Sequence, residues 1–137
     1  MTNIAIVYHK IDLVGNPYYN EYMKKDIKEI YELLQDKPKV ADKKLLQKAY
    51  EVAEQAHSTQ KRASGEPYFN HVFETAKNLA RFGLDATTVA AGLLHDTIED
   101  TDVTESEIQE MFGDEIVFLV NGVTKLGTLR YQGRERH

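Results

Sequence analysis

Apolar residues recur at helical spacing along most of the chain, and the segment from Asp85 to Asp100 combines such a stripe with a cluster of ionisable side chains. At about 100° per residue, one side of this helix would be apolar and the other would carry the ionisable groups. The apolar side holds Val89, Ala90, Leu93, Leu94, Thr97 and Ile98, and the other side holds Gly92, His95, Asp96, Glu99 and Asp100. Acids at the end of a helix oppose its macrodipole, so this end breaks a local rule, as functional sites often do. A solvated acidic helix end is the alternative interpretation.

The same spacing predicts further helices on both sides of this segment. They cover about 20–35, the stretch from Asp42 to about 56, the stretch from Pro67 or Asn70 to about 82, residues 104–112, and the stretch from 114 to about 126. Asp42 and Asp85 are predicted N-caps, Thr104 with Glu107 a capping box, and Gly83 and Gly113 helix stops. The pattern therefore predicts an all-α protein.

The two ends of the chain are patterned more weakly. Residues 1–19 include a turn signal, Gly15-Asn16-Pro17, and are expected to form a lead-in with at most one short strand. Residues 20–137 are expected to form one domain, whose pattern fades beyond Leu126. His9 and His137 lie in these ends and are interpreted as incidental.

Composition narrows the kinds of chemistry that are available. The chain has 137 residues and no cysteine, so disulfides and thiolate metal sites are excluded, and a metal would have to be bound by His, Asp, Glu and water. No apolar run approaches the ~20 residues of a membrane span, and residues 1–9 lack the basic start of a signal peptide. We therefore expect a cytoplasmic protein with no membrane contact.

Charge bears on the partners of the protein. The net charge of −5 argues against a nucleic-acid binder. Acidic residues concentrate in 95–115, where there is no Lys or Arg. An anionic substrate would be repelled from that segment unless a cation lay within it, although most of these acids can equally be explained as solvated helix faces.

A metal site needs ligands from more than one element, and His71 is the natural addition to His95 and Asp96. His71 lies near the start of the preceding helix, and an antiparallel hairpin can bring it to His95. A histidine near a helix start is more often a surface or packing residue, and His57, near the end of its helix, has less reason to be selected.

Three segments, taken in order, resemble the hydrolase domain of the RelA/SpoT family. The first runs from Ala56-His57-Ser58-Thr59-Gln60-Lys61-Arg62-Ala63-Ser64-Gly65-Glu66-Pro67-Tyr68 to His71. The second is Ala91-Gly92-Leu93-Leu94-His95-Asp96-Thr97-Ile98-Glu99-Asp100-Thr101. The third is Phe112-Gly113 with Leu119-Val120-Asn121-Gly122-Val123-Thr124-Lys125-Leu126. Together they cover about residues 42–126.

The resemblance implies the helical HD phosphohydrolase fold and hydrolysis of the guanine nucleotide (p)ppGpp, which releases pyrophosphate from the 3′ position and leaves GDP or GTP. It implies manganese as cofactor. Carried over by position, the metal ligands are His71, His95 and Asp96, the catalytic acids beside the attacking water are Glu99 and Asp100, and the substrate-binding residues are Arg62, Ser64 and, more weakly, Tyr68.

The chain departs from the family pattern in three places. Ala63 stands where some members carry Lys, and Val72 follows His71 where Pro is common. The family's fourth metal ligand, an Asp on a later helix, has no counterpart, since the last Asp is Asp114 in a different context. The chain therefore resembles a C-terminally incomplete hydrolase domain of a longer protein that can also carry a (p)ppGpp synthetase domain.

Two other functions are kept as alternatives: an HD phosphohydrolase for another nucleotide, and a catalytically silent module that binds nucleotide or a partner helix. We expect the fragment itself to bind metal weakly and to hydrolyse slowly. An apolar face near the C-terminal helix is expected to be covered by another copy of the chain, forming a homo-oligomer, or by the N-terminal segment.

Overall fold

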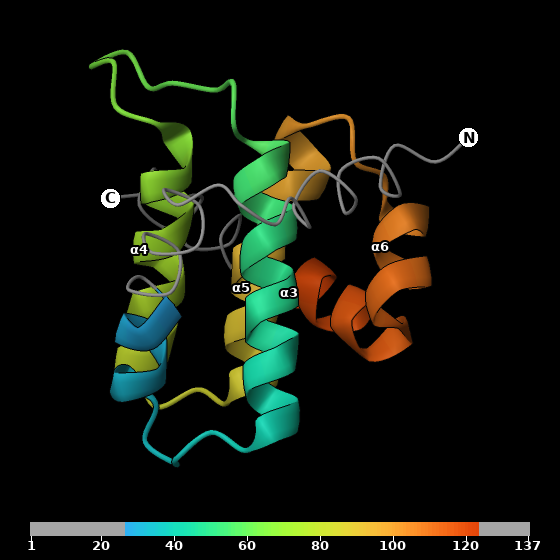
Figure 1. Cartoon of the computed structure of the whole chain (residues 1–137). Coiled ribbons are helices and arrows are strands. Elements are labelled where there is room, and N and C mark those ends of the chain that lie inside the picture. Colours follow the sequence, from blue (N-terminus) through green and yellow to red (C-terminus); the bar gives the residue numbers. More distant parts are fainter. Residues whose placement is uncertain (1–26, 124–137) are drawn as a thin grey trace, which may run out of the picture.

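The structure, a computed structural model, describes residues 27–123, and this part of the chain is helical (Figure 1). Its complete helices are α3 (Val40–Ala56), α4 (Tyr68–Arg81), α5 (Ala86–Asp100) and α6 (Glu105–Phe112). Residues 27–33 and 114–123 are also helical. Extended pairing within the described residues is limited to an isolated bridge between Lys61 and Pro67. The predicted all-α fold is confirmed.

Helix α5 is the centre of the bundle, because it packs along both α3 and α4, which touch each other much less (Figure 1). The prediction of a helix with one apolar side and one polar side is wrong for most of its length. Ala91, Gly92 and Asp96, which lie outside the apolar stripe, are buried as well. Two neighbouring helices cover α5, so only its last turn, with Glu99 and Asp100, is exposed.

Glycine at position 92 allows the close approach of α4 to α5. A Cβ atom added there would lie 2.3 Å from Cδ1 of Leu79 on α4. The absence of a side chain at Gly92, on the side of the helix predicted to be polar, makes room for a neighbouring helix.

Most helix ends follow the predicted caps. The Asp85 side chain accepts a hydrogen bond from the backbone N–H of Thr88, and Thr104 with Glu107 forms the expected capping box. The prediction that Asp42 is an N-cap is wrong. α3 begins two residues earlier, Lys39 is its N-cap residue, and Asp42 lies in the first turn, where its carboxylate accepts from the Lys39 N–H at 2.9 Å.

The same part of the chain contains no helix that is long and apolar enough to cross a membrane. The expectations for residues 1–19, His9, His137 and the segment beyond Leu126 concern residues outside the described range.

Candidate functional site

A histidine–aspartate pair lies near the C-terminal end of α5. Nε2 of His95 is 3.1 Å from Oδ1 of Asp96, and the two side chains are only 16% and 12% exposed. Nδ1 of His95 lies 2.9 Å from the carbonyl oxygen of Gly92. Since a carbonyl oxygen only accepts, Nδ1 carries the proton of this hydrogen bond.

This bond has a consequence for the other ring nitrogen. In a neutral imidazole with its proton on Nδ1, Nε2 presents a lone pair, and here it faces a carboxylate oxygen. Two lone pairs at 3.1 Å need a positive charge between them, either a proton or a metal cation. A carbonyl that orients the ring in this way is a common support for a histidine ligand.

The electrostatics of the pair agree with this geometry. Burial works against the charged form of His95, but the hydrogen bonds to Asp96 and Gly92 and the charges of Asp96 and Glu99 outweigh it and raise the pKa of His95. Burial likewise opposes ionisation of Asp96, yet the hydrogen bond to His95 and the nearby histidines lower the pKa of Asp96 below its usual range. Both shifts favour an ion pair.

His71 is near this pair but does not close on it. It is one of the histidines that lower the pKa of Asp96, and its ring lies 5.7 Å from that of Tyr68, centroid to centroid. Across residues 27–123, no three His, Asp or Glu side chains have the spacing of a metal site. The structure thus brings His95 and Asp96 together, and the convergence of His71 on them stays a prediction.

Tyr68, at the start of α4, contacts another predicted site residue, Asp100. Its hydroxyl donates a hydrogen bond to Oδ2 of Asp100 at 3.3 Å. Burial and the nearby carboxylates of Asp96 and Asp100, together with that hydrogen bond, raise the pKa of Tyr68 to about 12 against a smaller opposing effect of Arg62. Tyr68 therefore remains a neutral donor beside the exposed end of α5.

Arg62 and Ser64 lie on a short exposed loop that backbone hydrogen bonds hold closed. The N–H of Tyr68 donates to the carbonyl of Gln60 at 2.9 Å, and that of Arg62 donates to the carbonyl of Glu66 at 2.8 Å. The turn passes through Gly65, whose φ is +89° and whose missing Cβ would meet no atom within 4 Å. The loop therefore presents Arg62 and Ser64 to solvent from a defined backbone.

Two residues of this region were not among the predicted site residues. His57, at the C-cap of α3, is 1% exposed, and Gln60 hydrogen-bonds to it. His57 follows Ala53 by four residues and so continues the buried stripe of α3, which is the signal that could have identified it as an interior residue.

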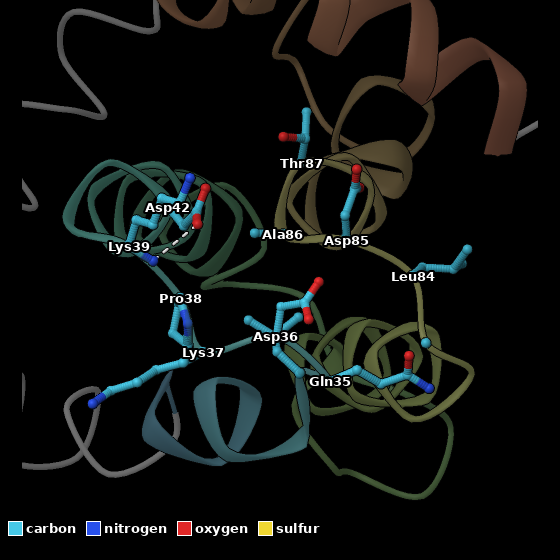
Figure 2. A pocket seen from close by; sticks show the side chains of 12 residues that line it. Gln35, Asp36, Lys37, Pro38, Lys39, Asp42, Leu84, Asp85, Ala86 and Thr87 are labelled. Atoms are coloured by element: carbon cyan, nitrogen blue, oxygen red, sulfur yellow. Dashed lines mark hydrogen bonds between the residues drawn. The ribbon is translucent and has the colours of Figure 1, made fainter.

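A cavity of about 240 Å³ lies at the opposite end of the bundle, where α3 and α5 begin and α4 ends (Figure 2). Its lining includes Asp36, Pro38, Asp42, Leu84 and Ala86, and none of the predicted site residues. The carboxylates that line it do not include three that could hold a metal. We therefore place the candidate site at the His95 end and not in this cavity.

Comparison with known proteins identifies the family of the chain. The family described as "HD domain" matches residues 49–137, which contain α4 and α5 with His71, His95 and Asp96. A guanosine-3′,5′-bis(diphosphate) 3′-pyrophosphohydrolase of Aquifex aeolicus is 45% identical over 107 residues, 78% of this chain and 15% of the relative.

Two relatives named as GTP pyrophosphokinases match a shorter stretch at higher identity. A GTP pyrophosphokinase rsh of Brucella ovis is 56% identical over 85 residues, 62% of this chain and 11% of the relative. A probable GTP pyrophosphokinase of Mycobacterium leprae is 51% identical over 86 residues, 63% of this chain and 11% of the relative. The chain thus spans 11–15% of the length of these relatives. The resemblance to the RelA/SpoT hydrolase domain is confirmed, and the chain belongs to the HD domain family.

Proposed function

We propose that this chain is a hydrolase domain that removes the 3′-pyrophosphate of (p)ppGpp in the cytoplasm, leaving GDP or GTP. The observation that carries the proposal is the His95–Asp96 pair, whose Nε2 and Oδ1 atoms are 3.1 Å apart near the end of α5. The name of the Aquifex aeolicus relative supplies the substrate.

The donor set fits a divalent cation. HD hydrolase domains generally use one, and carboxylate and water ligands suit manganese, the metal that the RelA/SpoT resemblance implies. His95 and Asp96 would hold it, with His71 as the third ligand once its side chain turns toward the pair. A bound cation would supply positive charge for the pyrophosphate and a more acidic water.

Glu99 and Asp100 supply the proton chemistry in this proposal. Both are exposed at the last turn of α5, one turn beyond the pair, so they can reach a water molecule that approaches the substrate. One of them would orient that water and accept its proton. The hydroxyl of Tyr68, which donates to Asp100, would hold this carboxylate in place.

Arg62 and Ser64 would bind the nucleotide. The exposed guanidinium of Arg62 can stack on a purine or pair with phosphate, and the Ser64 hydroxyl can donate to phosphate oxygens. Their loop is closed by backbone hydrogen bonds, so binding would require little further ordering.

The test is release of pyrophosphate from ppGpp, with GDP and GTP as alternative substrates, in the presence and absence of manganese. We expect manganese-dependent release from ppGpp and none from GDP. Equal release from all three nucleotides would favour an HD phosphohydrolase of another specificity. Nucleotide binding with no release would favour a silent binding module.

Substitution of Arg62 separates substrate binding from metal binding. We expect Arg62→Ala to weaken ppGpp binding at least tenfold, about 1.4 kcal/mol, and to leave manganese affinity unchanged, because Arg62 is a substrate contact only. Arg81→Ala, which removes an exposed arginine of α4 at the other end of the bundle, is the matched control. Isothermal titration measures both affinities, and an equal loss of manganese binding would contradict the assignment.

The number of ligands sets the expected metal affinity. Within residues 27–123 the site has at most His71, His95 and Asp96, while the RelA/SpoT family supplies a fourth Asp from a later helix. We expect calorimetric titration to show weak manganese binding by the 137-residue chain and tight binding by a form extended through that Asp. Equally tight binding by both forms would show that the fourth ligand is dispensable.

A further inference from the structure

A chain of side-chain hydrogen bonds joins the end of α3, the loop and α5, and none of its bonds involves the proposed metal ligands. The Gln60 amide nitrogen, Nε2, lies 2.5 Å from the carbonyl oxygen of Asp100, and Oε1 of Gln60 lies 2.7 Å from Nδ1 of His57. Nε2 of His57 lies 3.4 Å from the hydroxyl of Thr97. The path therefore leaves α5 at Asp100 and returns to it at Thr97.

The direction of every bond follows from one fixed acceptor. The carbonyl of Asp100 can only accept, so the amide nitrogen of Gln60 must face it and the amide oxygen must face His57. His57 then donates from Nδ1, and in the neutral ring Nε2 accepts from the Thr97 hydroxyl. In its neutral form this histidine, which is 1% exposed, therefore has a single tautomer.

These bonds lie at the C-terminal end of α5, where they connect the helix to the loop. The last carbonyl groups of a helix have no partner within the helix, and α5 has no basic residue in its last turn. Gln60 provides a partner from the loop that carries Arg62, and its own backbone is bonded to His57 and Tyr68. Together with the hydrogen bond from the Tyr68 hydroxyl to Asp100, this side chain therefore fixes the loop relative to the end of α5.

We propose that His57 and Gln60 are positioning residues that fix the loop of Arg62 and Ser64 against the last turn of α5, where Glu99 and Asp100 lie. That these residues hold the loop in place rests on the structure alone. That this position matters for catalysis rests on the proposed function. We call the hydrogen bonds of Gln60 to His57 and to the Asp100 carbonyl the clamp. When the clamp is broken, substrate still reaches Arg62, but its pyrophosphate no longer meets Glu99 and Asp100 at the distance needed for reaction.

Two substitutions of Gln60 separate the two bonds. Gln60→Glu has the same shape and still accepts from His57, but it cannot donate to the Asp100 carbonyl. Gln60→Ala removes both bonds. Gln55→Ala is the matched control, because Gln55 lies on α3, is also half-buried and has no described side-chain partner.

The first readout needs no activity. Nitrogen NMR of the wild-type chain should show His57 protonated on Nδ1, with its signals assigned through their loss in His57→Phe. Gln60→Glu should keep this tautomer, and Gln60→Ala should lose it. In both Gln60 variants the amide protons of Arg62 and Tyr68 should exchange at least tenfold faster than in the wild-type chain and in Gln55→Ala.

The second readout is turnover of ppGpp with manganese. We expect kcat to fall by about tenfold to a hundredfold in both Gln60 variants, with KM changed less than threefold, because displacement of about 1 Å costs that much. Protein that is merely less stable would keep its kcat per folded molecule, and circular dichroism measures the folded fraction. Wild-type kcat or wild-type exchange in Gln60→Glu would overturn the clamp. Absence of ppGpp turnover at saturating manganese, both in the 137-residue chain and in the form extended through the fourth Asp, would instead overturn the proposed function. The exchange and tautomer data would still decide whether the clamp exists.

Discussion

At the scale of single residues, backbone carbonyl groups of α5 define the roles of the side chains around them. The carbonyl of Gly92 places the proton of His95 on Nδ1, and the carbonyl of Asp100 orients the amide of Gln60. A carbonyl has no alternative to accepting, so the atom of each side chain that faces it must be a donor. The backbone of α5 therefore orients both the His95 ring and the Gln60 amide.

Removing the hydroxyl of Tyr68 tests its support of Asp100. Tyr68→Phe keeps the ring contacts with His57 and His71 but loses the donor to the carboxylate. We expect kcat/KM for ppGpp to fall about tenfold, as for loss of a hydrogen bond to a charged group worth roughly 1.5 kcal/mol. Tyr31→Phe removes a hydroxyl that donates to the Lys43 carbonyl at the other end of α3, and should leave turnover unchanged.

The cap of α5 should make stability depend on pH. Hydrogen bonds from Thr88, chiefly, lower the pKa of Asp85 below its ordinary value of 3.8. A lowered folded-state pKa adds stability that is complete above the ordinary value and is lost as pH falls through the folded value. Asp85→Asn keeps a cap acceptor without the charge, so its unfolding free energy should approach that of the wild type in acid.

Urea titrations of both proteins across this pH range give the comparison. Asp85→Ala, which lacks any acceptor, should cost about 1 kcal/mol near neutral pH. A wild-type advantage over Asp85→Asn that does not shrink in acid would contradict the role of the charge.

At the scale of elements, the sequence predicted the helix caps and stops, which depend on neighbouring residues. The caps at Asp85 and Thr104 and the stop at Gly113 were correct, because each is completed within a few residues. Asp42 was misplaced because a carboxylate can accept either as the N-cap or from the first turn, and both fit its neighbours equally well. The burial of Ala91 and Asp96 could not be predicted, because it depends on two helices that pack along α5.

The candidate site likewise contains features that local sequence predicts and a contact that it does not. The helical stripe placed His95 and Asp96 on one side of the helix, and the structure has their side chains 3.1 Å apart. The Gln60 bridge spans forty positions to Asp100, and no periodicity within a helix reports such a contact.

Because α4 packs closely on α5, the effect of Gly92→Ala on stability should change sign when Leu79 is also replaced. Gly92→Ala should gain about 1 kcal/mol of helix propensity but lose at least as much, because its Cβ would lie 2.3 Å from Leu79 Cδ1. In a Leu79→Ala background that conflict is absent, so the same substitution should stabilise. Thermal unfolding of the four proteins measures the coupling, and additive effects would show that α4 simply moves away.

At the scale of the whole molecule, the two ends of the bundle differ in character. The end formed by the C-termini of α3 and α5 carries the ionisable cluster, and the other end carries the cavity of Figure 2. Lys48 links α3 to α6 through its bond to the carbonyl of Met111 at 2.7 Å. Beyond α6, helix 114–123 presents Phe118, which is 77% exposed.

Exposure of Phe118 allows a test of the expectation that the face of this helix is covered by another copy of the chain or by the N-terminal segment. Phe118→Ser should leave the unfolding free energy within about 0.5 kcal/mol, because little packing is lost, and should shift the chain toward monomer. Phe82→Ser, which removes a phenylalanine that is 79% exposed at the end of α4, is the control and should not. Sedimentation velocity measures both. A wild-type chain that is monomeric at all concentrations would rule out this interface.

The turn at Gly65 makes the handedness of one residue important for the loop. With φ at +89° and no atom within 4 Å of the place that a Cβ would occupy, the position suits the mirror-image form of alanine and disfavours the natural one. A D-alanine introduced by chemical ligation would narrow the conformations of the free loop, whereas L-alanine would strain the turn. Chirality at a single atom could therefore set how rigidly the loop is held, without altering any side chain that bears on the chemistry.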